Sequence, residues 1–102
     1  MSNLKLEVQP KTAKRLRKVL KLYPDQESFA QSIIVHQINE LKQSIINLRL
    51  DLQEYEKKYQ LSTEDFYRRF TQGNTDDRED YIIWAGVYEM LRTNEEQLQE
   101  MQ

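Results

Sequence analysis

The sequence predicts a mainly α-helical protein: a short N-terminal β-strand, a basic helix, one very long second helix and a helical tail. The first reason is an apolar seam whose residues recur at alternating spacings of four and three, which places them on one side of a helix. Its members are Ile34, Ile38, Leu41, Ile45, Leu48, Leu52, Tyr55 and Tyr59. The second is that residues 26–59 contain neither proline nor glycine, so the helix could extend about 50 Å. Such a seam needs a cover, which a second copy, the chain's own tail or another protein could supply.

Length and composition narrow the class of protein. A chain of 102 residues forms one domain, or one domain with an arm, and buries only a modest core, so dimerisation would help it. There are no cysteines, which excludes disulfides and thiolate metal sites and favours a reducing compartment. The sequence has no N-terminal apolar region and no long apolar run. We therefore expect a soluble, cytoplasmic protein without a membrane partner, a cofactor or a small-molecule substrate.

The net charge of −2 conceals a division along the chain. Residues 1–24 contain seven basic and one acidic side chain, a net charge of +6. Residues 25–102 contain eight basic and sixteen acidic side chains, a net charge of −8. A basic head and an acidic body indicate two different partners. The simpler interpretation is a solvated, lysine-rich helix.

The head changes its periodicity at a proline. Residues 4–8 alternate between apolar and polar, as in a strand with one buried face, and Pro10 ends that pattern. Residues 11–22 follow the helical period. The apolar face of this helix holds Ala13, Leu16 and Leu20, and the opposite face holds Lys11, Lys14, Lys18 and Lys21. Pro24 then interrupts the chain, and Asp25 is a good N-cap for the long helix.

The segments LKLEVQP, KTAKRLRKVLKLY and DQESFAQSIIVHQI together resemble the ribbon-helix-helix (MetJ/Arc type) DNA-binding domain, over roughly residues 3–40. In that family, strands from two chains pair into a ribbon that enters the major groove. The resemblance implies a homodimer, or a tetramer, that binds operator DNA. The residues it implies for DNA contact are Asn3, Lys5, Glu7, Lys11, Lys14 and Lys18. Asp25 and Glu27 depart from the family, because their negative charge would weaken phosphate binding at the start of the second helix.

Written as heptads, the seam has Ile38, Ile45, Leu52 and Tyr59 at a, and Ile34, Leu41, Leu48 and Tyr55 at d. Isoleucine at a with leucine at d favours a parallel two-chain coiled coil. A ribbon-helix-helix dimer and a parallel coil cannot both hold over the whole length, because the second helices of that fold should cross and then diverge. A plain coiled coil without the N-terminal fold is therefore an alternative. Ile46 and Leu50 form a smaller apolar spot on the opposite side of the helix.

The tail contains two further helices. Ser62 is a good N-cap for the first, which carries Phe66 and Phe70, and residues 72–74 include a glycine that should stop it. Acidic residues at 76–80 suit the start of the second. Its apolar face holds Tyr81, Trp84, Tyr88, Leu91 and Leu98, widened by Ile83, Val87 and Met90. We expect this last helix to cover part of the seam between Leu41 and Tyr59. The aromatic cluster is either the chain's own core, a surface for another protein, or a core that a partner completes.

Residues 56–92 are similar to the C-terminal segment of small prokaryotic antitoxins. The matching residues are Tyr59, Phe66, Phe70, Gly73, Asp77, Asp80, Tyr81, Trp84 and Tyr88. The two resemblances imply a type II antitoxin that represses its own operon and neutralises a cognate toxin. We expect the toxin to bind an aromatic face ringed by carboxylates, namely Phe66, Phe70, Tyr81, Trp84 and Tyr88 with Asp76, Asp77, Glu79 and Asp80. The implied organisation is a DNA-binding dimerisation module at 1–40, a helical arm at 41–61 and a partner-binding tail at 62–102.

Enzymatic functions are disfavoured. The DDxxD pattern at 76–80 is the arrangement that holds Mg²⁺ in some helical enzymes, but it also suits a helix start. His36 is the only histidine, so it has no second histidine or cysteine for a triad or a zinc site. We therefore predict no catalytic residues and no metal. The main alternative to the antitoxin is a structural or adaptor coiled-coil protein without DNA binding, and a metal-dependent enzyme is a distant third.

Overall fold

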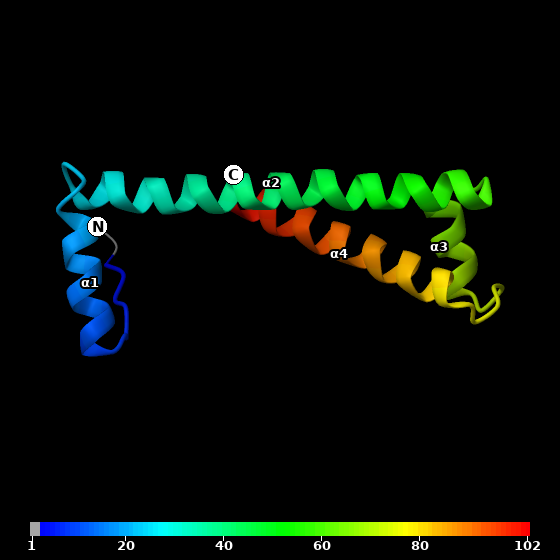
Figure 1. Cartoon of the computed structure of the whole chain (residues 1–102), viewed down its shortest axis with the longest axis horizontal. Coiled ribbons are helices and arrows are strands. Elements are labelled where there is room, and N and C mark those ends of the chain that lie inside the picture. Colours follow the sequence, from blue (N-terminus) through cyan, green and yellow to red (C-terminus); the bar gives the residue numbers. More distant parts are fainter. Residues whose placement is uncertain (1–2) are drawn as a thin grey trace. The chain divides into compact units, whose positions relative to one another are not determined.

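A computed structural model describes residues 3–102, and this part of the chain contains four helices (Figure 1). They are α1 (Pro10–Leu20), α2 (Gln26–Tyr59), α3 (Thr63–Thr71) and α4 (Glu79–Met101). The prediction of a mainly α-helical protein is confirmed. The chain divides into two compact units, an N-terminal unit up to Val35 and a C-terminal unit, His36–Gln102, and α2 belongs to both. The division falls a few residues before the boundary expected at residue 40.

The predicted N-terminal strand is wrong. Residues 3–9 form neither a strand nor a helix, and no other segment of residues 3–102 is a strand. An alternating pattern becomes a strand only when a neighbouring strand accepts and donates its backbone hydrogen bonds. Leu4 is accordingly 89% exposed. The ribbon-helix-helix fold class depends on this strand, so it is corrected to an all-helical fold for the described residues.

Local signals account for the helices of the N-terminal unit. Pro10 occupies the first turn of α1, where its missing N–H is not needed. The break after α1 leads to Asp25, whose Oδ1 accepts a hydrogen bond from the backbone N–H of Ser28 at 2.6 Å. That bond caps α2 as predicted, and it holds the pKa of Asp25 below its ordinary value of 3.8. The short α1 buries none of its residues, so this unit has no core of its own in the described chain.

Local signals also set the turns of the C-terminal unit. The Ser62 hydroxyl accepts a hydrogen bond from the Asp65 N–H, so it caps α3 as predicted. Gly73 has a φ of 73° and ends α3 as expected. The turn there is a Schellman motif, in which the N–H of Asn74 donates to the carbonyl of Arg69 at 2.9 Å. The last helix begins at Glu79, so Asp76 and Asp77 precede it instead of lying in its first turn.

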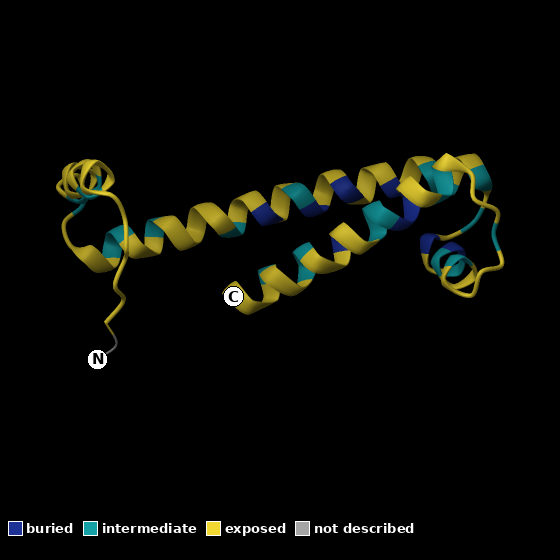
Figure 2. Cartoon of the chain, turned by 90° about the horizontal axis from the view of Figure 1, so that it is seen from below, coloured by how far each residue is buried: buried dark blue, intermediate teal, exposed yellow. Residues whose placement is uncertain are grey.

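The core of the C-terminal unit forms where α3 turns away from the end of α2 and α4 runs back towards the middle of α2 (Figures 1 and 2). Its buried members are Ile45, Leu48, Leu52, Phe66, Trp84, Ala85 and Leu91. The prediction that the last helix covers part of the seam is therefore confirmed. Because these seam residues pack against the chain's own tail, they are not free to form a parallel coil with a second chain. The early seam residue Ile34 remains exposed.

Candidate partner-binding and nucleic-acid-binding surfaces

Two of the five aromatic residues predicted to bind a partner are core residues. Trp84 is fully buried, and Phe66 is 1% exposed. Their rings stack in parallel with centroids 3.8 Å apart. The Trp84 Nε1–H donates a hydrogen bond to the buried Thr63 hydroxyl at 3.0 Å, so its one polar group is satisfied. Phe66 and Trp84 hold the unit together and do not reach a partner while it is folded.

The other three predicted aromatic residues lie at the margin of the core. Phe70, Tyr81 and Tyr88 are each half-buried. Tyr81 meets Tyr59 edge to face at 5.1 Å, and Tyr88 meets Tyr67 in the same way at 4.8 Å. These contacts fix the ring positions and leave part of each ring accessible. Helical spacing alone could not separate these three residues from Phe66 and Trp84, because all five lie on apolar faces of the predicted tail helices.

The predicted ring of carboxylates is half neutralised within the chain. Asp76 accepts two hydrogen bonds from the Arg78 guanidinium, at 2.7 and 2.9 Å, and these lower its pKa to about 2. Asp80 accepts from Lys58 at 2.7 Å and from the Tyr59 hydroxyl at 2.5 Å, and the Lys58 bond is the largest cause of its lowered pKa. Among residues 3–102, no group of three or more His, Cys, Asp or Glu side chains is placed to hold a metal ion.

The residues predicted to bind DNA lie partly on an irregular segment and partly on a helix. Asn3, Lys5 and Glu7 are exposed on the irregular segment that precedes α1. Lys11, Lys14 and Lys18 are exposed on α1 itself. The spacing of these three lysines places them on one side of the helix, opposite the half-buried Ala13, Leu16 and Leu20. The structure therefore presents a basic helical face, but not the strand that was expected to carry the base contacts.

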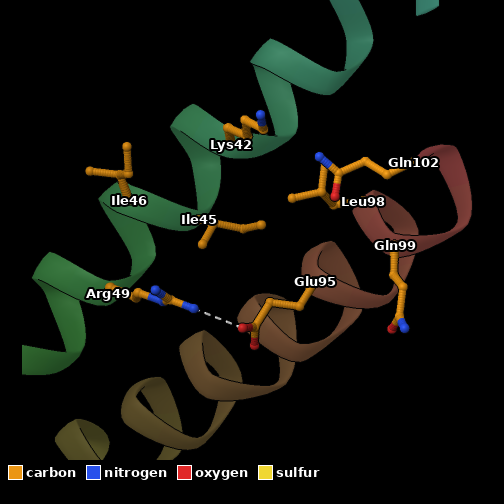
Figure 3. Close-up of a pocket in the computed structure, with 8 residues that line it drawn as sticks. All are labelled: Lys42, Ile45, Ile46, Arg49, Glu95, Leu98, Gln99 and Gln102. Carbon is orange, nitrogen blue, oxygen red and sulfur yellow. Dashed lines mark hydrogen bonds and ion pairs between the residues drawn. The ribbon is translucent and has the colours of Figure 1, made fainter.

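Three hollows lie beside the pairing of α2 with α4, and two of them, of about 510 and 450 Å³, share Arg49 and Glu95 on one flank. The hollow of about 510 Å³ lies beside the last turns of α4 (Figure 3). It has apolar walls from Ile45, Ile46 and Leu98, and an ion pair of 2.9 Å between Arg49 and Glu95 crosses its rim. The predicted apolar spot at Ile46 and Leu50 is exposed next to it.

A smaller hollow of about 360 Å³, which we call the acidic groove, is lined by Asp51, Glu54, Tyr55, Ile83 and Val87. Sequence reasoning missed this groove. Ile83 and Val87 were recognised only as a widening of an apolar face, and their neighbours on α2 could not be known before α4 was placed. The available signal was their spacing of four residues, which puts both on one side of α4.

No family model, no curated protein and no solved structure matches this chain. None of the helices within residues 3–102 combines the length and the apolar character needed to cross a membrane. We therefore infer the function from the charge, exposure and packing of the residues. Their arrangement offers a basic helix in one unit, and exposed apolar and acidic groups around a well-packed core in the other.

Proposed function

We propose that the protein is an antitoxin: a cytoplasmic binding protein, not an enzyme, that neutralises a toxin and represses its own operon. One observation carries the proposal, namely that the two compact units differ in the sign of their charge. The residues up to Val35 include seven basic and three acidic side chains, a net charge of +4, whereas His36–Gln102 has eight basic and fourteen acidic, a net charge of −6. Opposite charges on separate units suit a nucleic-acid partner for one and a basic protein for the other.

The basic helix supports the DNA-binding half of the proposal. Lys11, Lys14 and Lys18 form one exposed row along α1. Because these side chains are already exposed, they can neutralise DNA phosphates without a change in the fold. The α1 face opposite the lysines carries apolar side chains, so the helix can bind phosphate on one side while packing on the other. We further propose that Asn3, Lys5 and Glu7, on the irregular segment before α1, contact the bases.

Exposed apolar side chains support a homodimer. Eight of the fourteen large hydrophobic residues that the described chain exposes lie in the N-terminal unit, which has about a third of the residues. They are Leu4, Leu6, Val8, Val19, Leu22, Ile33, Ile34 and Val35. Covering a side chain of this size removes it from water at a gain of roughly 1.5 to 3 kcal/mol each. We propose that a second copy supplies the cover, which would also double the basic surface offered to DNA.

The DNA-binding half is tested by fluorescence anisotropy with the duplex that precedes the protein's own gene. The double variant Lys14→Glu, Lys18→Glu should weaken binding and reduce the slope of log affinity against log salt by about 4, because the dimer loses two phosphate contacts from each copy. Lys42→Glu, an exposed lysine of the C-terminal unit, is the matched control and should leave the slope unchanged. A wild-type protein that binds no DNA even at low salt would be the adaptor that the sequence offers as the alternative.

The toxin-binding half is tested with the product of the neighbouring gene. We expect its expression alone to arrest growth, and co-expression with this protein to restore it. Binding should be direct and measurable by titration calorimetry with both purified proteins. A neighbouring product that is harmless, or that does not bind, would overturn the antitoxin proposal.

A further inference from the structure

The two flanks of the α2–α4 pairing have different chemistry. One flank carries side chains of both signs, including Lys42, Arg49 and Glu95, and Arg49 is already engaged by Glu95. The other flank is the acidic groove, whose only charged lining residues are Asp51 and Glu54. A surface that carries charges of both signs attracts a charged partner weakly, whereas one with a single sign attracts the opposite sign. The acidic groove is therefore the more selective of the two flanks.

The α4 wall of the acidic groove is apolar. Ile83 and Val87 line it, and Met90, three residues further on, continues their row along α4 beyond the lining. Ile83 is 43% exposed and Met90 is 57% exposed, while Val87 and the facing Tyr55 are half-buried. The wall thus continues the core of the C-terminal unit outward to the surface. It offers a row of apolar contacts running along the helix axis.

The α2 wall of the same groove is negatively charged. Within residues 3–102, neither Asp51 nor Glu54 has a hydrogen-bond or ion-pair partner from a side chain. The nearest lysine along that face of α2, Lys58, is engaged by Asp80 at 2.7 Å. The pKa of Tyr55 in the groove is raised, first by burial and then by the negative charges of Asp80 and Asp51. The groove therefore has uncompensated negative charge beside an apolar row.

We propose that the acidic groove is the docking site for a basic amphipathic helix of the partner protein. Such a helix would lay its apolar side against Ile83, Val87 and Met90 and direct lysine or arginine side chains to Asp51 and Glu54. A helix fits because both walls run along helix axes, and amphipathic helices bind such grooves through residues spaced at i, i+3, i+4 and i+7. The proposal names the surface by which the proposed antitoxin binds its toxin, and it rests on that function for the partner's identity.

Paired variants test the groove with the purified product of the neighbouring gene as the probe. Ile83→Asp should weaken binding at least about tenfold, because it places a charge in the apolar wall. Ile82→Asp is its matched control, since Ile82 is 57% exposed on the same helix but lies away from the groove lining. Asp51→Lys should likewise weaken binding about tenfold, mainly at low salt, and Glu96→Lys is the control with the same change of charge. Circular dichroism should show equal helix content for all four variants.

A synthetic probe separates this proposal from the antitoxin function. An amphipathic helical peptide of leucine and lysine should bind the wild-type protein more tightly than it binds Asp51→Lys, whatever the neighbouring gene encodes. The same peptide with glutamate in place of lysine should not bind. If the gene product binds and all four variants bind it equally, the antitoxin function stands and the groove proposal is overturned. If a peptide of residues 10–22 of this chain bound more tightly than the leucine-lysine peptide, the groove proposal would also be overturned, because the groove would then hold the protein's own basic helix.

Discussion

The two units of this chain use the same kind of helix in opposite ways. The apolar seam of α2 continues from one unit into the other at regular spacing, yet Ile34 is 41% exposed while Leu48 is 8% exposed. The C-terminal unit supplies its own cover through α3 and α4, and the N-terminal unit has only the short α1, which buries nothing. An amphipathic pattern gives a helix one apolar face, but only the rest of the chain decides whether that face is buried within the same chain.

The largest expected effect on the free energy of unfolding comes from a charge placed at the buried end of the seam, compared with the same change at its exposed end. Leu48→Asp should lower the free energy of unfolding by more than about 4 kcal/mol, because it removes a buried leucine and buries an unpaired charge. Ile34→Asp occupies the equivalent heptad position but lies on the surface of the single chain, so at concentrations too low for dimerisation it should change the free energy of unfolding by only about 0.5 kcal/mol. Urea denaturation followed by circular dichroism measures both. Equal losses for the two variants would mean that the seam is not divided as described.

Removing the central aromatic residue should have the next largest effect. Trp84→Ala leaves a cavity under Phe66, Tyr55 and Tyr59, and should lower the free energy of unfolding by about 3 to 5 kcal/mol. Ile82→Ala, on the exposed side of the same helix, is the control and should be near neutral. Thermal denaturation by circular dichroism checks both. A Trp84→Ala protein that is as stable as the wild type would return Trp84 to the partner surface that the sequence predicted.

A single hydrogen bond inside the core gives a smaller test. Thr63→Val keeps the shape of the side chain but leaves the Trp84 Nε1–H without an acceptor, and should lower the free energy of unfolding by about 1 to 3 kcal/mol. Thr63→Ser should restore most of that loss. Thr93→Val, at an exposed position of α4, is the comparison and should have little effect. If Thr63→Val proved neutral, the buried indole would need another acceptor.

The smallest expected effect is on acid stability. Asp76 has a pKa lowered from 3.8 to about 2, and that of Asp80 is also lowered. A carboxyl with a lowered pKa in the folded state stabilises the fold above its unfolded pKa, and this stabilisation is lost as the pH falls through the folded value. The double variant Asp76→Asn, Asp80→Asn should therefore be less stable than the wild type at pH 5 and similar to it near pH 2. The control Asp77→Asn removes a carboxylate that has no side-chain partner among the described residues, and it should lower the urea midpoint at pH 5 by less than the double variant does.

Much of the helical framework could be predicted because its signals are local. Asp25 and Ser62 cap helices through atoms three residues away, and Gly73 ends α3 through its own left-handed φ. The long helix between residues 26 and 59 could be predicted from the helical spacing of its apolar seam and from the absence of proline and glycine. Each of these features depends on neighbours in the chain, so the sequence alone determines them.

The strand, the core and the candidate site depended on contacts that are distant in sequence. Residues 4–8 alternate correctly for a strand, but a strand needs a partner that the described chain does not supply. Phe66, Trp84 and Tyr88 belong to one predicted aromatic cluster, and only the packing of α3 and α4 on α2 places the first two inside and the third at the margin. The acidic groove likewise exists only because α4 brings Ile83 beside Asp51. Periodicity fixes which side of a helix is apolar, whereas burial is a property of two surfaces, and the second surface is known only from the tertiary structure.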